Sequence, residues 1–206
     1  MKPVTGNNNP SADVNKVSVR LDSGGHSFSV ELLPKKAFDS ASVVEFTVIT
    51  HKSLLIPSEI FDASAAANYL AVAGLACSSA EQPLCMEAGD KTVVAAVDRS
   101  CLEAIGEQFD SRAVFTSPLL QCCDNPSSKL HICTYDRVAC FKLYGEDGRL
   151  RFAEMLRCAG SDDILYYVHE LSTQFDIDGL LIYICGDHAV ESAKLLKKYF
   201  GRVKCE

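Results

Sequence analysis

The chain has 206 residues, of which 48% are hydrophobic and 23% are charged, and its formal net charge is −7. This length and composition are typical of a globular protein with a sizeable core. The acidic balance argues against a nucleic-acid partner or an anionic membrane surface, because phosphate groups are bound mainly by Lys and Arg. No segment reaches the ~20 apolar residues that span a bilayer.

The first fifteen residues are polar, contain several Asn and Pro residues, and lack the apolar core of a signal peptide. They predict a disordered tail and no export. The chain has ten cysteines. Without export these are expected to be thiols in the reducing cytoplasm, because disulfides persist mainly in oxidising compartments.

The N-terminal half begins with two alternating segments, 17–22 and 27–32, on either side of a Gly-Gly turn, which predict a β-hairpin. The β-branched and aromatic segment 43–50 predicts a third strand. Residues 51–62 are expected to form a crossing segment. Asp62 is expected to cap a helix over 63–75.

A polar loop is expected next, followed by an unbroken apolar strand at 92–97. Asp98 is expected to cap a helix with an apolar face, and a strand at 113–117 closes this half. The turn-rich segment 119–127 is predicted to connect the halves.

In the C-terminal half, residues 129–144 predict a second hairpin and 149–157 a third strand. A helix capped by Ser161, an apolar strand at 180–185, a helix opened by Asp187 and a short strand near 202–205 follow. Both halves are therefore predicted to have the same order of elements, which is strand, strand, strand, helix, strand, helix, strand. The repeated order predicts an internal duplication in an α/β protein, with domains at 16–118 and 128–206.

This order, with two ribonuclease H-like halves, resembles the actin-like ATPase superfamily, which includes actin, sugar kinases and heat-shock chaperone ATPases. More closely, the chain is similar to a bacterial domain family of unknown function assigned to that superfamily. The stretches that carry the resemblance are VRLDSGGHSFSV, SLLIPSEIFDASAAANYL, VVAAVDRSCLEAIGEQF, DILYYVHELSTQFDIDGLLIYICGD and SAKLLKKYF.

The resemblance implies a site for ATP and Mg²⁺ between the halves. Its first phosphate turn corresponds to Asp22, Ser23, Gly24, Gly25 and Ser27, with Asp22 positioning the metal. Glycines there let backbone N–H groups approach a phosphate, although the same residues also suit an ordinary hairpin turn.

The other two elements of the implied site are incomplete. In the second phosphate turn Asp136 is kept, but Tyr135 and Arg137 replace glycines. The adenosine-side pair keeps Gly186 and has Asp187 in place of the second glycine. An Asp at a helix N-terminus caps the helix but repels an anion. His26, His131 and Arg137 could add positive charge to the cleft.

The broken motifs favour a degenerate actin-like fold acting as a non-catalytic binding or scaffold protein with a protein partner, with no catalytic residue assigned. The alternative is a nucleotide-binding protein or weak ATPase that uses the Asp22–Gly25 turn. A minor alternative is a metal-dependent nuclease built on a set of carboxylates. The carboxylates considered are Asp22, Glu45, Asp98 and Asp187.

A zinc site is a weaker hypothesis. Cys185 and His188 have a C-x-x-H spacing, but zinc sites usually combine two such pairs. The cysteines within apolar strands are better interpreted as small hydrophobic residues.

Overall fold

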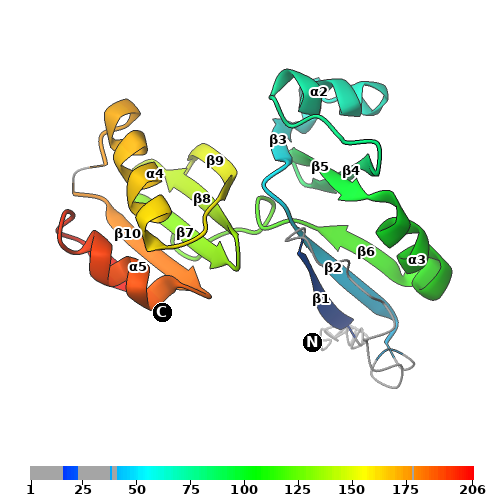
Figure 1. The fold of residues 1–206 in the computed structure, drawn as a ribbon. Helices are drawn as coiled ribbons and strands as arrows, with labels where there is room; N and C mark the ends of the chain where they lie inside the picture. Colours follow the sequence, from blue (N-terminus) through cyan, green and yellow to red (C-terminus); the bar gives the residue numbers. More distant parts are fainter. Residues whose placement is uncertain (1–15, 23–37, 39–40, 178) are drawn as a thin grey trace, which may run out of the picture.

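The computed structural model describes residues 16–22, 38, 41–177 and 179–206. Figure 1 shows two lobes joined by the segment between β6 and β7. We call the elements from β1 to β6 the N-terminal lobe and those from β7 to β11 the C-terminal lobe. The predicted tail (1–15), the predicted strand 27–32 and the glycine turn lie outside the described residues.

The C-terminal lobe has the element order that its sequence predicts. Its five-stranded sheet has the order β11-β10-β7-β8-β9, in which β7, β8 and β9 are antiparallel and β10 is parallel to both β7 and β11. The elements are β7 (Lys129–Tyr135), β8 (Val138–Tyr144), β9 (Leu150–Arg157), α4 (Ser161–Gln174), β10 (Leu181–Gly186), α5 (Ala189–Leu196) and β11 (Val203–Cys205).

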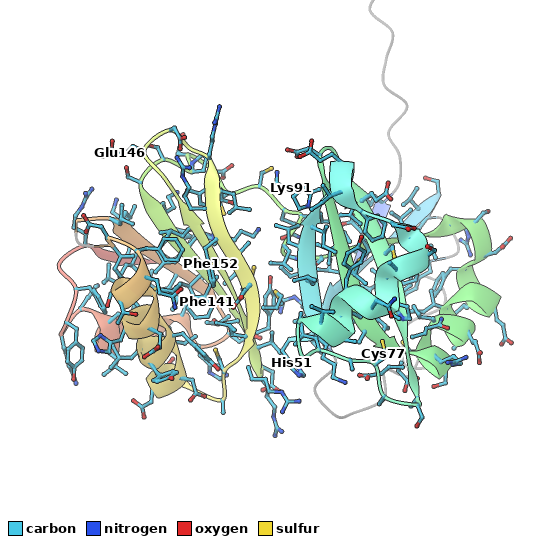
Figure 2. All side chains as sticks on the ribbon, turned by 90° about the horizontal axis from the view of Figure 1, so that it is seen from above. His51, Cys77, Lys91, Phe141, Glu146 and Phe152 are labelled. Atoms are coloured by element: carbon cyan, nitrogen blue, oxygen red, sulfur yellow. The ribbon has the colours of Figure 1, made fainter. Side chains whose placement is uncertain are left out.

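One face of this sheet packs against α4 and α5. Alternate residues of the strands, such as Ile132 and Ile184, are fully buried there with Ile164 and Val168 of α4. Figure 2 shows Phe141 inside this lobe. Burial of such side chains contributes roughly 1.5–3 kcal/mol each and holds the helices on the sheet.

The N-terminal lobe contains a parallel sheet with the order β1-β2-β6. Its strands are β1 (Lys16–Asp22), β2 (Val43–Ile49) and β6 (Ala113–Thr116). The predicted strands at 17–22, 43–50 and 113–117 are therefore confirmed. β1 and β2 are parallel neighbours, so these two strands are not partners in an antiparallel hairpin.

A second sheet in this lobe has the order β3-β5-β4 and is antiparallel. It consists of β3 (Ser53–Pro57), β4 (Glu81–Ala88) and β5 (Lys91–Asp98), and α2 (Ala66–Val72) packs against it. The expectations of a crossing segment at 51–62 and of a polar loop before residue 92 were wrong. In β4 only Met86 is buried, so the strand lacks an apolar signature and is defined by its pairing with β5.

The helix starts agree only partly with the predicted caps. Asp98 does cap α3 (Arg99–Phe109), since its side chain accepts a hydrogen bond from the Cys101 amide. Asp62 instead caps the short 3₁₀ turn η3 (Ala63–Ala65). Ser161 is the first residue of α4 and not its cap. The carboxylate of Asp163 accepts from the Ala159 amide at 2.6 Å and stabilises this helix start. The other 3₁₀ turns are η2 (Ser58–Ile60) and η4 (Asp110–Arg112).

The two lobes share one hydrophobic core. Phe46 and Phe109 of the N-terminal lobe belong to the same buried cluster as Tyr135 and Met155 of the C-terminal lobe. Leu119, in the predicted connecting segment, is also buried in this cluster. The connection is therefore packed, and unfolding of one lobe would expose apolar surface of the other.

A buried lysine holds the connecting segment against the C-terminal sheet. Lys142 of β8 is 3% exposed, and its Nζ donates to the carbonyl oxygen of Gln121 at 2.5 Å. Nearby, Lys129 Nζ donates to the carbonyl of Asp124 at 2.6 Å. The bond to Gln121 supplies a partner for the Lys142 cation, which would otherwise be costly to bury.

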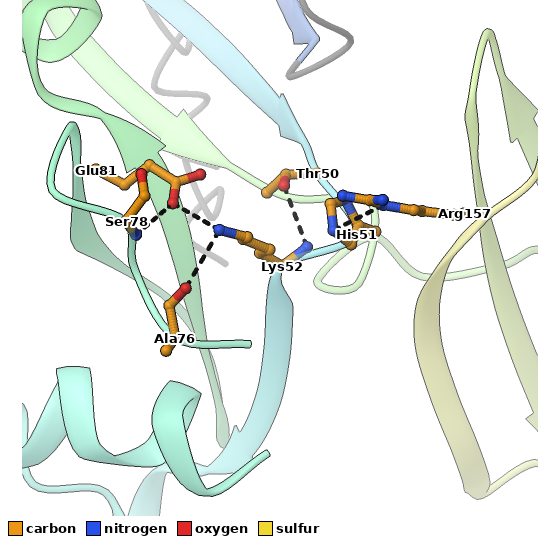
Figure 3. A network of polar contacts seen from close by, with 7 residues as sticks. All are labelled: Thr50, His51, Lys52, Ala76, Ser78, Glu81 and Arg157. Carbon is orange, nitrogen blue, oxygen red and sulfur yellow. Dashed lines mark hydrogen bonds and ion pairs between the residues drawn. The ribbon is translucent and has the colours of Figure 1, made fainter. Parts of the chain in front are cut away.

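A polar contact joins the lobes at the edge of the C-terminal sheet. Arg157 Nε, at the end of β9, donates to Nε2 of His51, which lies just before β3, at 3.0 Å (Figure 3). The same segment is tied to its own lobe by Lys52, whose Nζ lies 2.6 Å from Glu81 Oε2 and donates to the carbonyl of Ala76. Only the neutral form of His51 can accept this bond.

Burial lowers the pKa of His51, as do the charges of Arg157 and Lys52, whereas Glu81 raises it. The folded state thus binds fewer protons here than the unfolded state. The stability from this group is complete above the unfolded pKa of about 6.5 and is lost as the pH falls through the lower folded value.

We therefore expect acidification from about pH 7.5 to about pH 5 to lower the free energy of unfolding, and His51→Gln to weaken this dependence. The Gln side chain can still accept from Arg157 but does not titrate. Urea denaturation across this range measures the slope. An equal slope in His51→Gln and the parent protein would contradict the expectation.

Candidate functional site

The ends of β1, β7 and β10 bring predicted site residues from both lobes together. Asp22 ends β1, Asp136 lies in the β7–β8 turn, and Gly186 and Asp187 follow one another at the end of β10. Partial burial raises the pKa of Asp22, the Arg20 guanidinium lowers it, and the charges of Asp187 and Asp136 raise it. The carboxylates of Asp136 and Asp187 therefore lie close enough to Asp22 to influence its charge. Ser23, Gly24, Gly25 and Ser27 lie outside the described residues.

Arg20 is a site residue that the motif comparison does not include. It lies two positions before Asp22 in β1, and side chains two apart in a strand share a face. Its Nη1 lies 3.7 Å from Oδ1 of Asp187, and its Cζ lies 5.5 Å from the centre of the Tyr135 ring. A cation of the N-terminal lobe thus contacts the ends of both β7 and β10.

The turn after β10 is attached directly to β7. The Asp187 amide donates to the carbonyl of Thr134 at 3.0 Å, and the His188 amide donates to Thr134 Oγ1 at 3.2 Å. The Thr134 hydroxyl in turn donates to the carbonyl of Cys185 at 3.0 Å. The two amides that precede α5 are therefore satisfied within the protein.

Gly186 makes this close approach possible. Its φ is +99°, and a Cβ at this position would lie 2.0 Å from the Thr134 carbonyl oxygen. Only a residue without a side chain fits both the backbone conformation and the space. The glycine is explained by this strand contact.

The predicted role of Asp187 as a helix cap was wrong. Helix α5 begins at Ala189 with His188 at its N-cap position and no side-chain cap. The carboxylate of Asp187 is paired with Arg20 instead. The left-handed turn at Gly186 places Asp187 before the cap position, which local sequence spacing does not reveal.

The second turn differs from a glycine-rich phosphate loop. Tyr135 is 6% exposed and packs into the shared core, where burial raises the pKa of its phenol. Arg137 is exposed and its Nε lies 3.8 Å from Asp136 Oδ2. The predicted positive contribution of His131 was wrong, because burial lowers its pKa to about 4 and leaves the ring neutral at pH 7.

The carboxylates of the nuclease hypothesis do not form one set. Asp98 caps α3, and Glu45 lies 2.7 Å from Lys16 Nζ on β1. Only Asp22 and Asp187 lie near each other. Among the described residues, no group of three or more His, Cys, Asp or Glu side chains is placed to hold a metal ion. In the same part of the chain, no helix is long and apolar enough to cross a membrane.

Comparison with solved structures identifies a similar protein from Bacteroides thetaiotaomicron, with an actin-like ATPase fold and unknown function. The TM-score is 0.66 and the identity 16%, over 84% of this chain and 74% of that chain. The cytoplasmic domain of EpsL, an inner membrane component of the type II secretion system of Vibrio cholerae, matches with a TM-score of 0.47 and 12% identity, over 84% of this chain and 82% of that chain. No family model and no curated protein matches. The chain has an actin-like ATPase fold, as the resemblance predicts.

Proposed function

We propose that this chain is a non-catalytic binding or scaffold protein that uses a degenerate actin-like fold to engage a protein partner. The observation that carries the proposal is the turn after β10. Its amides at Asp187 and His188 donate to Thr134, so they are not free to bind a phosphate. A helix N-terminus binds anions through free amides of this kind.

The electrostatics of the region support the same conclusion. Asp22, Asp136 and Asp187 contribute negative charge, and Arg20 is already paired with Asp187 and lies over the Tyr135 ring. A nucleotide phosphate would have to displace this ion pair and approach the carboxylates. Like charges at close range disfavour that approach.

The C-terminal lobe also exposes aromatic side chains. Tyr166 of α4 and Tyr199 after α5 are 58% and 66% exposed, and with Leu165 and Phe200 they line a groove of about 360 Å³. Aromatic residues are enriched at protein–protein interfaces, which supports a binding role.

The proposal includes a division of the chain into lobes at 16–118 and 128–206, with 119–127 as connection, and an origin by internal duplication of a ribonuclease H-like unit. The C-terminal lobe has the element order that was predicted for each half, which supports the ribonuclease H-like unit. We also propose a cytoplasmic location, which the ten free cysteines support.

The second candidate is a nucleotide-binding protein or weak ATPase that uses the Asp22–Gly25 turn with ATP and Mg²⁺. It is favoured by the convergence of the β1, β7 and β10 ends on one region, where Asp22 is influenced by carboxylates of the other lobe. A magnesium ion could offset the mutual repulsion of these carboxylates and of a triphosphate.

Isothermal titration calorimetry of the full chain with ATP and Mg²⁺ distinguishes the two candidates. We expect no binding heat and no phosphate release above background. Micromolar binding would overturn the proposal. If it were accompanied by hydrolysis that Asp22→Ala abolished and Asp90→Ala, a change in the β4–β5 turn, left intact, the second candidate would replace it.

A further inference from the structure

Two cysteines that the proposed function does not use lie opposite each other in the C-terminal sheet. Cys133 of β7 and Cys185 of β10 are direct partners in the parallel register. Their neighbours Ile132 and Ile184 are fully buried under the helices, so the cysteines lie on the other face of the sheet. Both cysteines are partly exposed.

A histidine and a second hydrogen-bond acceptor lie beside the pair. Nε2 of His131, two positions before Cys133 in β7, lies 3.9 Å from Cys185 Sγ, and its ring stacks on Tyr183 at a centroid distance of 5.3 Å. The Cys185 thiol also lies 3.7 Å from the carbonyl of Ile132. The pair therefore lies on a sheet face that also carries polar side chains, among them His131 and Lys142.

The surroundings of the two thiols change their pKa values in opposite directions. The neighbouring Cys185 thiol lowers the pKa of Cys133 to about 6 against the effect of burial, and Tyr135, Arg20 and Lys142 lower it further. The same interaction between the thiols, together with burial, raises the pKa of Cys185. The interaction between the two thiols therefore favours ionisation of Cys133 over ionisation of Cys185. A reactive cysteine next to a resolving one is the usual arrangement of a redox-sensing site.

We propose that Cys133 and Cys185 form a reversible redox site, which a peroxide oxidises to a disulfide between β7 and β10. The Cys133 thiolate attacks one oxygen of hydrogen peroxide, the O–O bond breaks, and the departing hydroxide takes a proton to give water. Cys133 is now a sulfenic acid. Cys185 loses its proton and attacks that sulfur, so that the S–S bond forms, the S–O bond breaks, and a second water leaves.

The strand geometry allows this bond but strains it. Neighbouring strands are about 4.8 Å apart, within the Cα separations of about 4.4–6.8 Å found in disulfides. Direct partners keep their Cβ atoms slightly farther apart than an ideal disulfide requires, so the strands must shift. Strained, partly exposed disulfides are reduced more easily than structural ones, which suits a reversible site.

The site adjoins the contact between the turn and β7. Thr134 follows Cys133, and Gly186 follows Cys185, and these two residues form the close backbone approach. A disulfide would cross-link the strands immediately before that contact. This inference goes beyond the proposed function and does not depend on it.

The first experiment maps thiol reactivity in the full wild-type chain. Limited alkylation by iodoacetamide near pH 6.5, followed by peptide mass mapping, should label Cys133 on the order of tenfold faster than Cys101. Cys101 of α3 is a matched comparison, because it is also partly exposed but burial raises its pKa. Labelling of Cys133 no faster than Cys101 would overturn the proposal.

The second experiment follows oxidation. After one equivalent of hydrogen peroxide and blocking with N-ethylmaleimide, a non-reducing digest should contain the Cys133–Cys185 peptide pair, and dithiothreitol should remove it. Cys185→Ala should leave Cys133 as a sulfenic acid that dimedone traps, and the control Cys101→Ala should still form the disulfide. A disulfide between other cysteines, or oxidation that spares Cys133, would contradict the assignment.

Discussion

Replacement of Gly186 by Ala is expected to lower the free energy of unfolding by about 4 kcal/mol. The added Cβ would lie 2.0 Å from the Thr134 carbonyl oxygen, at a φ of +99°. Left-handed strain contributes roughly 1–3 kcal/mol and overpacking roughly the same again. The obstructing atom is backbone in the central strand of the sheet, so a rotamer change cannot relieve it. Equilibrium urea denaturation measures the difference.

Gly179 provides the matched control for this substitution. It precedes the same strand and also has a positive φ of +81°, but nothing lies within 4 Å of the position that a Cβ would take there. Gly179→Ala should therefore cost only about 1 kcal/mol, from backbone strain alone. If both variants lost the same stability, the contact between the β10 turn and Thr134 would not be the reason for Gly186.

Replacement of Phe46 by Ala is expected to be of similar severity, at about 4 kcal/mol. Phe46 is fully buried, with its ring centre 5.3 Å from that of Phe109 and 5.6 Å from that of Phe115. The smaller side chain would leave a cavity that β2 and β6 cannot close, because both are held by parallel pairing. Phe61→Ala is the control, since Phe61 is only partly buried and should cost about 1 kcal/mol.

The Phe46→Ala variant also tests whether the two lobes unfold together. The cluster of Phe46 includes Tyr135, Val138 and Met155 of the C-terminal lobe. Hydrogen exchange of the Phe46→Ala variant should therefore accelerate in β7 and β8 as well as in the N-terminal sheet. Acceleration confined to the N-terminal lobe would show that the lobes unfold independently.

Features of the fold that depend on a few neighbouring residues were predicted correctly, whereas those that depend on distant residues were not. The apolar run at 92–97 predicts β5 correctly because this strand is buried on both faces. The run at 180–185 also predicts a strand correctly, although β10 alternates between buried and partly exposed residues. Asp98 is predicted correctly because its capping bond closes within three residues. Strand β4 was missed because, apart from Met86, its side chains are not buried, and its pairing with β5 supplies the evidence for it.

In the candidate site, too, the sequence predicts individual residues but not the contacts between distant ones. The motif comparison identifies Asp22, Asp136, Gly186 and Asp187, but it assigns Asp187 to a helix cap and omits Arg20. The spacing of Arg20 and Asp22 already places both on one face of a strand. That this face meets Asp187 and Tyr135 depends on residues more than one hundred positions away.

The amino-acid sequence by itself determined the order of elements in the C-terminal lobe, several strands of the N-terminal lobe and the incompleteness of the phosphate motifs. These depend on side-chain periodicity, capping and glycine content, which act over a few residues. Only the tertiary structure decided the parallel pairing of β1 with β2, the shared core, the Arg20–Asp187 pair and the Cys133–Cys185 pair. Each of these joins residues distant in the chain, and their approach is set by packing of the whole fold, which no local pattern encodes.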